Sequence, residues 1–206
     1  MDTIARSVCV VKLGGSLLDV PGLPARLFQV LQTESAQTEF WLIPGGGRFA
    51  EEIRRLDRIS HWPAEVSHRL AIQTMGLTAQ LVAESSPLFE RVEKLDAVST
   101  PGRVRVLDVS QLPEIDGLPA TWEITSDSIA AFVATRLQAS RLLLLKSISL
   151  PSPPPSADAA ARAGWVDSCF AGYAAKIPQV CWQNFRQSEE MPQTWLQWGV
   201  VVGERG

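Results

Sequence analysis

Short apolar runs alternate along this chain with longer segments in which apolar residues recur at helical spacing. Continuous apolar runs of this kind are typical of strands that are buried on both faces of a sheet. Three runs fit that description, at residues 8–13, 39–44 and 142–145. A fourth segment, residues 103–109, alternates apolar and polar positions, which predicts a half-exposed strand.

Helical periodicity occupies the segments between these strands. Apolar residues return every three or four positions in residues 23–32, 48–58 and 64–83, as expected for helices with one buried face. A further helix is predicted to begin at Thr125 or Ser126, either of which suits an N-cap, and to run to about residue 138. Strands alternating with helices through short turns predict an α/β fold with a parallel sheet covered on both faces.

The last quarter of the chain is less regular. Residues 151–156, PSPPPS, predict an extended surface loop because proline disrupts both helix and sheet. A last short strand is predicted at residues 198–204. The length of 206 residues is enough for one α/β domain with a substantial core. We therefore expect a single domain over residues 1–206.

Charge and cysteine content argue against several classes of protein. The net charge is −3, and no basic face of the kind that binds nucleic acid or acidic membranes is evident. The three cysteines are widely spaced and form no CxxC pair, so neither a disulfide framework nor a metal site is expected. Neither a membrane span nor a signal peptide is evident. We expect a cytoplasmic protein.

The first predicted strand ends at a pair of glycines. The segment VVKLGGSLL places Lys12 two residues before Gly14 and Gly15, with Ser16 after them. Glycines at a strand end expose successive N–H groups to an anion, and a lysine adds a charge for phosphoryl oxygens. The alternative is a tight turn beside a chance lysine. Phosphate binding is favoured because an ammonium group in an apolar strand requires a partner.

A second glycine cluster, in IPGGGRFAEEI, lies between a buried strand and an amphipathic helix. Gly45, Gly46 and Gly47 there precede a helix N-terminus, which is suited to bind an anion. The string also fits the dinucleotide-binding pattern of an NAD(P)-dependent oxidoreductase, with Ala50 in its last slot and Glu65 about 20 residues on. That alternative leaves the first glycine cluster unexplained. A merely tight loop is the third interpretation.

Charged residues further along the chain complete a candidate site. Asp127 either caps a predicted helix or orients a lysine, and phosphoryl transfer depends mainly on such positioning and charge neutralisation. Lys146 either finishes a buried strand or faces the rim where both glycine clusters lie, at the carboxyl ends of the strands. Five further candidates also have ordinary packing or surface roles open to them: Arg48, His68, Met75, Ser126 and Lys176.

Together, VVKLGGSLL, IPGGGRF, TSDSIAA and RLLLLKS resemble the amino acid kinase family, and their order and spacing agree over about the first 150 residues. The resemblance implies a three-layer αβα sandwich with a central, mostly parallel sheet. It also implies an ATP-dependent phosphotransferase that uses Mg²⁺. The catalytic residues would be Lys12, Asp127 and Lys146. The residues binding ATP and phosphate would be Gly14, Gly15, Ser16 and Lys176. The residues facing the acceptor would be Gly45, Gly46, Gly47, Arg48, His68, Met75 and Ser126.

Within the family, SDSIA, HRLAIQTMG and the short length are most similar to the aminomethylfuran phosphate kinases of methanofuran biosynthesis. This likeness implies that [5-(aminomethyl)furan-3-yl]methyl phosphate is converted to its diphosphate. The expected partners are ATP and a small phosphorylated metabolite, with neither nucleic acid nor membrane, and the chain is expected to form a homo-oligomer.

The sequence departs from the family after Lys146, where SISLPSPPPS replaces a turn that contains aspartate and glycine. Residues 1–140 would form the acceptor-side half and residues 141–206 an abbreviated nucleotide-side half. Either Lys146 or Lys176 then supplies the second catalytic charge, or ATP binding is lost. In the second case the chain would be a non-catalytic binder of a phosphorylated metabolite.

Overall fold

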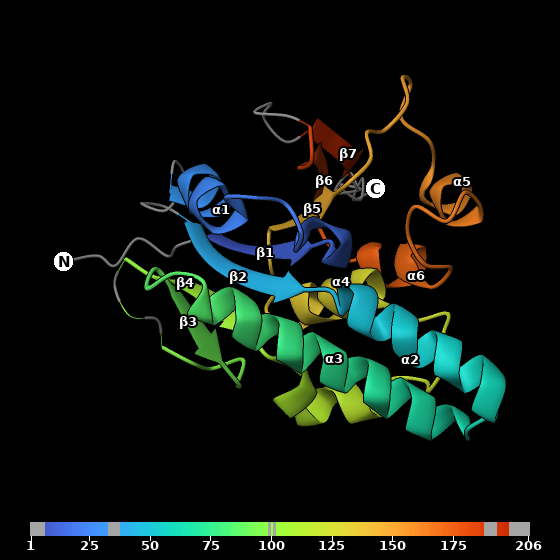
Figure 1. The fold of residues 1–206 in the computed structure, drawn as a ribbon. Helices are drawn as coiled ribbons and strands as arrows, with labels where there is room; N and C mark the ends of the chain where they lie inside the picture. The colour runs from blue at the N-terminus through green and yellow to red at the C-terminus, as the bar shows by residue number, and fades with distance from the viewer. Residues whose placement is uncertain (1–6, 33–37, 99, 101, 188–192, 198–206) are drawn as a thin grey trace, which may run out of the picture.

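A seven-stranded sheet lies at the centre of the molecule, with the strand order β3-β4-β2-β1-β5-β6-β7 (Figure 1). The structure is a computed structural model that describes residues 7–32, 38–98, 100, 102–187 and 193–197. Adjacent strands are parallel except for β6 and β7, which are antiparallel. The strands are β1 (Ser7–Leu13), β2 (Thr38–Pro44), β3 (Phe89–Val92), β4 (Val104–Leu107), β5 (Arg141–Lys146), β6 (Gln179–Asn184) and β7 (Gln193–Gln197).

Helices cover both faces of this sheet, so the three-layer αβα sandwich is confirmed (Figure 1). Helices α4 and α6 pack against one face and α1 against the other, while α3 contributes to both cores. No helix in the described ranges has the length and apolar character needed to cross a bilayer. The α-helices are α1 (Leu23–Gln32), α2 (Gly47–Ser60), α3 (Ala64–Glu84), α4 (Ser126–Arg136), α5 (Ala157–Arg162) and α6 (Phe170–Ala174).

The central strand β1 supplies both cores because successive side chains of a strand point to opposite faces. Val10 packs in the core that contains α4, whereas Cys9 and Val11 pack in the core that contains α1. Lys12 follows Val10 by two residues and therefore shares its face. The strand thus directs a lysine, only 4% exposed, toward the layer of α4.

The alternating segment at residues 103–109 forms β4, but the prediction that it is half-exposed is wrong. All four residues of β4 are buried. The guanidinium of Arg105 lies 4.5 Å from the ring centroid of Trp41 and forms an ion pair with Glu39. A polar position in this strand therefore indicates a buried and paired side chain, not a solvent-facing one.

The strong apolar patterns in the sequence locate most of the remaining elements. The helices expected at residues 23–32, 48–58 and 64–83 and near Ser126 are present as α1 to α4. Strands β3 and β6 were not predicted, because β3 carries two charged residues among four and β6 has glutamines near both ends. The strand expected at residues 198–204 lies outside the described residues.

The two glycine turns touch because β1 and β2 are neighbours in register, with Leu13 opposite Pro44. The N–H of Gly45 donates to the carbonyl of Leu13 at 2.8 Å. A Cβ atom on Gly15 would lie 2.3 Å from the backbone nitrogen of Gly47, which has a φ of +55°. Only glycine fits this contact, so the two turns form one backbone surface.

Replacement of Gly15 by alanine is expected to force the two turns apart. Overpacking of this kind typically costs about 1–3 kcal/mol, so the free energy of unfolding of G15A should fall by that amount in urea titrations. The matched control is G117A, because a Cβ at Gly117 meets no atom within 4 Å. Equal stability of G15A and G117A would show that the turns are not in contact.

Candidate active site

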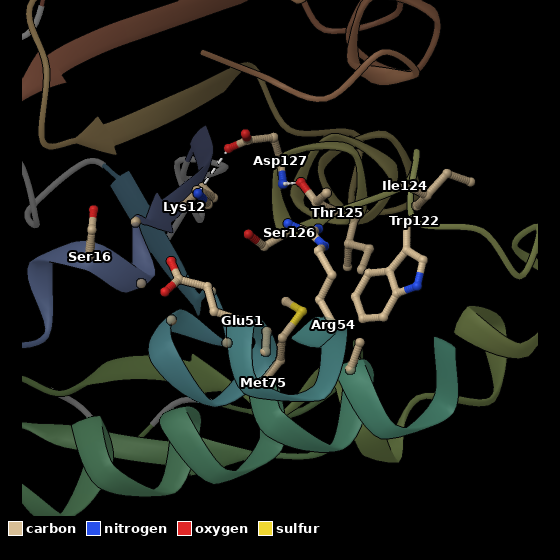
Figure 2. A pocket seen from close by; sticks show the side chains of 18 of the residues that line it. Lys12, Ser16, Glu51, Arg54, Met75, Trp122, Ile124, Thr125, Ser126 and Asp127 are labelled. Carbon is tan, nitrogen blue, oxygen red and sulfur yellow. Dashed lines mark hydrogen bonds and ion pairs between the residues drawn. The ribbon is translucent and has the colours of Figure 1, made fainter. Parts of the chain in front are cut away.

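A cavity of about 430 Å³ opens beside the two glycine turns, at the carboxyl ends of β1, β2 and β5 (Figure 2). Its walls also include the exposed start of α2, the middle of α3 and the beginning of α4. Segments between residues 12 and 165 that are far apart in the sequence therefore meet around one space. The prediction that both glycine clusters face a shared gap is confirmed by this arrangement.

One carboxylate in this cavity is held between two lysines. The Nζ atom of Lys12 lies 2.9 Å from Oδ1 of Asp127, and Nζ of Lys146 donates to Oδ2 at 2.7 Å. All three side chains are largely buried: Lys12 is 5% exposed, Asp127 6% and Lys146 12%. Two ammonium groups and one carboxylate leave one uncompensated positive charge, which faces the glycine turns.

The charges in this cluster shift the pKa of Asp127 and of Lys146. Burial raises the pKa of Asp127, but the ammonium groups of Lys12 and Lys146 outweigh burial and hold this pKa at about 2. Burial and, to a smaller extent, the charge of Lys12 lower the pKa of Lys146 to about 8 despite the opposing effect of Asp127. The carboxylate is therefore ionised at neutral pH, whereas Lys146 is a weaker base than an ordinary lysine.

Asp127 is positioned by the cap at the start of α4. The side chain of Thr125 accepts from the N–H of Asp127, as predicted for an N-cap, and the carboxylate lies in the first turn where it suits the helix dipole. A second aspartate, Asp167, accepts from the N–H and hydroxyl of Thr125 at 3.0 and 2.8 Å. It also accepts from the N–H and hydroxyl of Ser128.

The far end of the cavity, between α2, α3 and the segment before α4, is more apolar. Met75 is buried there beside His68, and both line the cavity as predicted. Burial lowers the pKa of His68, although a hydrogen bond with the Thr121 backbone opposes this effect. The Nε2 atom of His68 is buried and makes no hydrogen bond to any described residue. The imidazole is therefore neutral at pH 7.

Comparison with known proteins agrees with this arrangement. The model of the amino acid kinase family matches residues 7–150, which is most of the chain and includes every residue of the lysine–aspartate cluster. This chain belongs to the amino acid kinase family. The motifs on which the resemblance was based therefore identified the family correctly.

One relative within the amino acid kinase family is [5-(aminomethyl)furan-3-yl]methyl phosphate kinase from Methanocaldococcus jannaschii. It is 27% identical over 143 residues, which are 68% of this chain and 65% of the relative. The match thus spans about two thirds of each protein.

Solved structures of the same fold include two uridylate kinases and an aspartate kinase. The enzyme from Archaeoglobus fulgidus superposes with a TM-score of 0.57 at 17% identity, covering 85% of this chain and 89% of that one. The enzyme from Ureaplasma parvum superposes with a TM-score of 0.58 at 13% identity, covering 89% of this chain and 92% of that one. Aspartate kinase from Synechocystis superposes with a TM-score of 0.63 at 14% identity, covering 92% of this chain and 40% of that one. At these identities the likeness shows the fold.

Most of the residues expected from the amino acid kinase motifs line the cavity. They are Lys12, Gly14, Gly15, Ser16, Gly45, Gly46, Gly47, His68, Met75, Ser126, Asp127 and Lys146. Arg48 does not join them, because its side chain is 85% exposed and pairs with Asp19 beside a separate groove. Lys176 is exposed and also lies away from the cavity lining. The structure thus brings together twelve of the fourteen expected residues.

The acidic residue of the dinucleotide-binding pattern is also misplaced. Glu65 is exposed in the first turn of α3 and does not line the cavity. In a dinucleotide site this residue would approach a ribose next to the glycine loop. The glycine-rich string therefore belongs to the amino acid kinase motif.

The sequence analysis missed cavity residues on α2 that the helical spacing of this segment indicates. Gly47, Ala50, Glu51 and Arg54 follow one another at spacings of three, one and three residues, and all four line the cavity. The last three lie three, four and seven residues after Gly47, so all four share one face of a helix. Extending this face from Gly47 would have found Glu51 and Arg54. Trp122 also lines the cavity, and Asp167 anchors the start of α4 outside the lining; both lie in irregular segments, where no spacing rule indicates them.

Asp127→Asn is expected to destabilise the protein, because it leaves two buried ammonium groups without a carboxylate. Removing one partner of a buried ion pair typically costs about 3–5 kcal/mol. Urea denaturation at neutral pH measures the change in the free energy of unfolding. Asp116→Asn is the control, since Asp116 is exposed and its loss should change stability by less than about 0.5 kcal/mol. Equal stability of both variants would contradict the role of Asp127.

Proposed function

We propose that this protein is an ATP-dependent phosphotransferase whose acceptor is a small phosphorylated metabolite. The observation that carries this proposal is the cluster of Lys12, Asp127 and Lys146, whose excess positive charge faces the two glycine turns across one cavity. Membership of the amino acid kinase family supports it.

Phosphoryl transfer requires positioning and charge neutralisation more than covalent chemistry from the protein. An oxygen of the acceptor would bond to the γ-phosphorus of ATP while the bond from that phosphorus to its bridging oxygen breaks. ADP then leaves with the electron pair. Lys12 and Lys146 would neutralise the charge on the transferring group, and Asp127 would hold both lysines in place. The backbone N–H of Gly15 would bind one of its oxygens, whereas the N–H of Gly14 already donates to the carbonyl of Leu145 at 2.8 Å.

The state of Asp127 favours an acceptor that is already ionised. With a pKa of about 2, this carboxylate is too weak a base to take a proton from an alcohol at neutral pH. A phosphate monoester needs no such base, since its second pKa is about 6. Its oxygen can react in the ionised form that predominates in solution.

The named relative suggests which phosphate monoester this is. We propose [5-(aminomethyl)furan-3-yl]methyl phosphate as the acceptor and its diphosphate as the product, since the relative is a kinase of that compound. The volume of the cavity lies in the range typical of small-molecule sites. Gly45, Gly46, Gly47, Ser126, His68 and Met75 would contact the acceptor.

The residues present fit the phosphoryl groups of ATP better than they fit a protein-held metal. The ammonium groups of Lys12 and Lys146 lie in the cavity beside these turns, whose glycines place no side chain in it. Among the described residues, no three acidic, histidine or cysteine side chains form a metal-binding cluster. Mg²⁺ usually binds through substrate phosphates and one or two carboxylates, so it would arrive with ATP.

We also propose that the two halves of the chain bind different substrates. Residues 1–140 would form the acceptor-side half, and residues 141–206 would form the nucleotide-side half around α5, α6, β6 and β7. Lys146, at the end of β5, would supply the second catalytic charge instead of the exposed Lys176. That the chain forms a homo-oligomer stays a prediction.

Lys12→Ala is expected to reduce ATP turnover by at least about 100-fold, because removing one group that stabilises the transferring charge typically costs that much. The assay couples ADP release to NADH oxidation, with Mg²⁺ and three acceptors: the aminomethylfuran phosphate, uridylate and isopentenyl phosphate. Lys176→Ala is the matched control and should retain wild-type rates. An active K12A would remove Lys12 from the mechanism. Tight acceptor binding by wild type without ATP turnover would indicate a non-catalytic binding protein.

The rate should also depend on the charge of Lys146. Its pKa of about 8 lies below the ordinary value of 10.5, so the ammonium form is lost as the pH rises through 8. We expect kcat/KM for ATP to be constant between about pH 7, where the acceptor phosphate is ionised, and this pH, and to fall above it. Lys146→Arg keeps its charge at every accessible pH, so the fall should move to higher pH. An unchanged profile in this variant would mean that another group titrates.

A further inference from the structure

We propose that Arg54 binds the phosphate that the acceptor already carries, and that Trp122 and Asp57 position Arg54 for this contact. The assignment rests on the proposed phosphotransferase function and adds the residue that selects phosphorylated acceptors. Arg54 lines the cavity from α2, and Figure 2 shows its side chain extending toward Ser126 at the start of α4.

Arg54 differs from its neighbour on the same helix. Arg55 donates two hydrogen bonds to Glu52, at 2.9 and 2.7 Å, and does not line the cavity. Arg54 makes neither an ion pair nor a hydrogen bond with any residue that the structure describes; its recorded contact is with the ring of Trp122. Its positive charge and its N–H donors are therefore available to a ligand in the cavity.

Trp122 supports the guanidinium without using its donors. The Cζ atom of Arg54 lies 4.7 Å from the centroid of the Trp122 ring, within the range of a cation–π interaction. Such a contact restricts the guanidinium while leaving its N–H groups free to bind oxygen atoms. An arginine arranged in this way is preorganised for a phosphate, which it can bind through two parallel hydrogen bonds.

Asp57 fixes Trp122 in turn. Its Oδ2 atom accepts from Nε1 of Trp122 at 2.7 Å, and its Oδ1 atom accepts from the hydroxyl of Ser67 at 2.7 Å. These two hydrogen bonds lower the pKa of Asp57, so the carboxylate stays ionised at neutral pH. One aspartate thereby links α2, α3 and the segment before α4. Both of its oxygens are engaged away from Arg54, whose charge is not neutralised.

The cavity therefore contains two separate centres of positive charge. The first is the cluster of Lys12, Lys146 and Asp127, with one excess charge, and the second is Arg54. A transfer between two phosphates brings two anions into one space, and a single positive centre would leave their repulsion largely unopposed. Two centres in one cavity match a phosphorylated donor and a phosphorylated acceptor.

The test compares Arg54→Gln with Arg55→Gln in the coupled assay with the aminomethylfuran phosphate. Losing charge-assisted hydrogen bonds should raise KM for the acceptor by about 10- to 100-fold in R54Q, with KM for ATP changed by less than about twofold. R55Q should behave as wild type. Arg54→Lys should recover part of the affinity, since it restores the charge without the planar fork. An unchanged acceptor KM in R54Q, or an equal rise in R55Q, would overturn the assignment.

Trp122→Phe tests the positioning role, because it keeps an aromatic ring but loses the hydrogen bond to Asp57. We expect a smaller rise in acceptor KM, about three- to tenfold, with kcat retained. A W122F enzyme with wild-type KM would show that Asp57 does not position Arg54 through Trp122.

A binding experiment separates this assignment from the proposed activity. Isothermal titration with the phosphorylated furan and with its unphosphorylated alcohol needs no turnover. Wild type should bind the phosphate ester more tightly, and R54Q should lose most of that difference. If wild type shows this preference but transfers no phosphoryl group, the phosphotransferase proposal fails while Arg54 remains the phosphate-binding residue. If R54Q keeps the full preference, the assignment to Arg54 fails whatever the activity.

Discussion

The structure depends on one buried carboxylate that is shared between two lysines. Asp127 is the partner of both Lys12 and Lys146 at their buried strand ends, and leaving a buried ammonium group unpaired is costly. The ion pairs therefore fix the relative positions of β1, β5 and α4. They also leave one positive charge in excess, so the same contacts that hold the three elements together create an attraction for anions.

The backbone around this charge is shaped for the same purpose. The contact between Gly15 and Gly47 brings the ends of β1 and β2 within reach of the cluster, without side chains in between. On the other side of the cavity, Arg54 adds a second positive centre that rests on an aromatic ring. The proposed reaction needs both features, since donor and acceptor phosphates must approach each other despite their repulsion.

Much of this could be predicted from the sequence, because the decisive signals are local. Buried apolar runs located β1, β2 and β5, and the glycine clusters at their ends located the cavity. Arg105 misled the prediction for β4, since alternation does not distinguish an exposed polar residue from one stacked on an aromatic ring and paired. Trp122 supports Arg54 from an irregular segment, and the hydrogen bond that fixes Trp122 joins it to Asp57, 65 residues earlier in the chain. No spacing rule predicts such a contact.

The aspartate at position 167 has a consequence for where the functional unit ends. The match to the family stops at residue 150, yet Asp167 accepts hydrogen bonds from Thr125 and Ser128, on either side of Asp127. A shortened chain that kept only residues 7–150 would retain Lys12, Asp127 and Lys146 but lose Asp167, which anchors the start of the helix that carries Asp127. Any minimal version of this protein, or any transplant of its cavity into another scaffold, must therefore extend past residue 167.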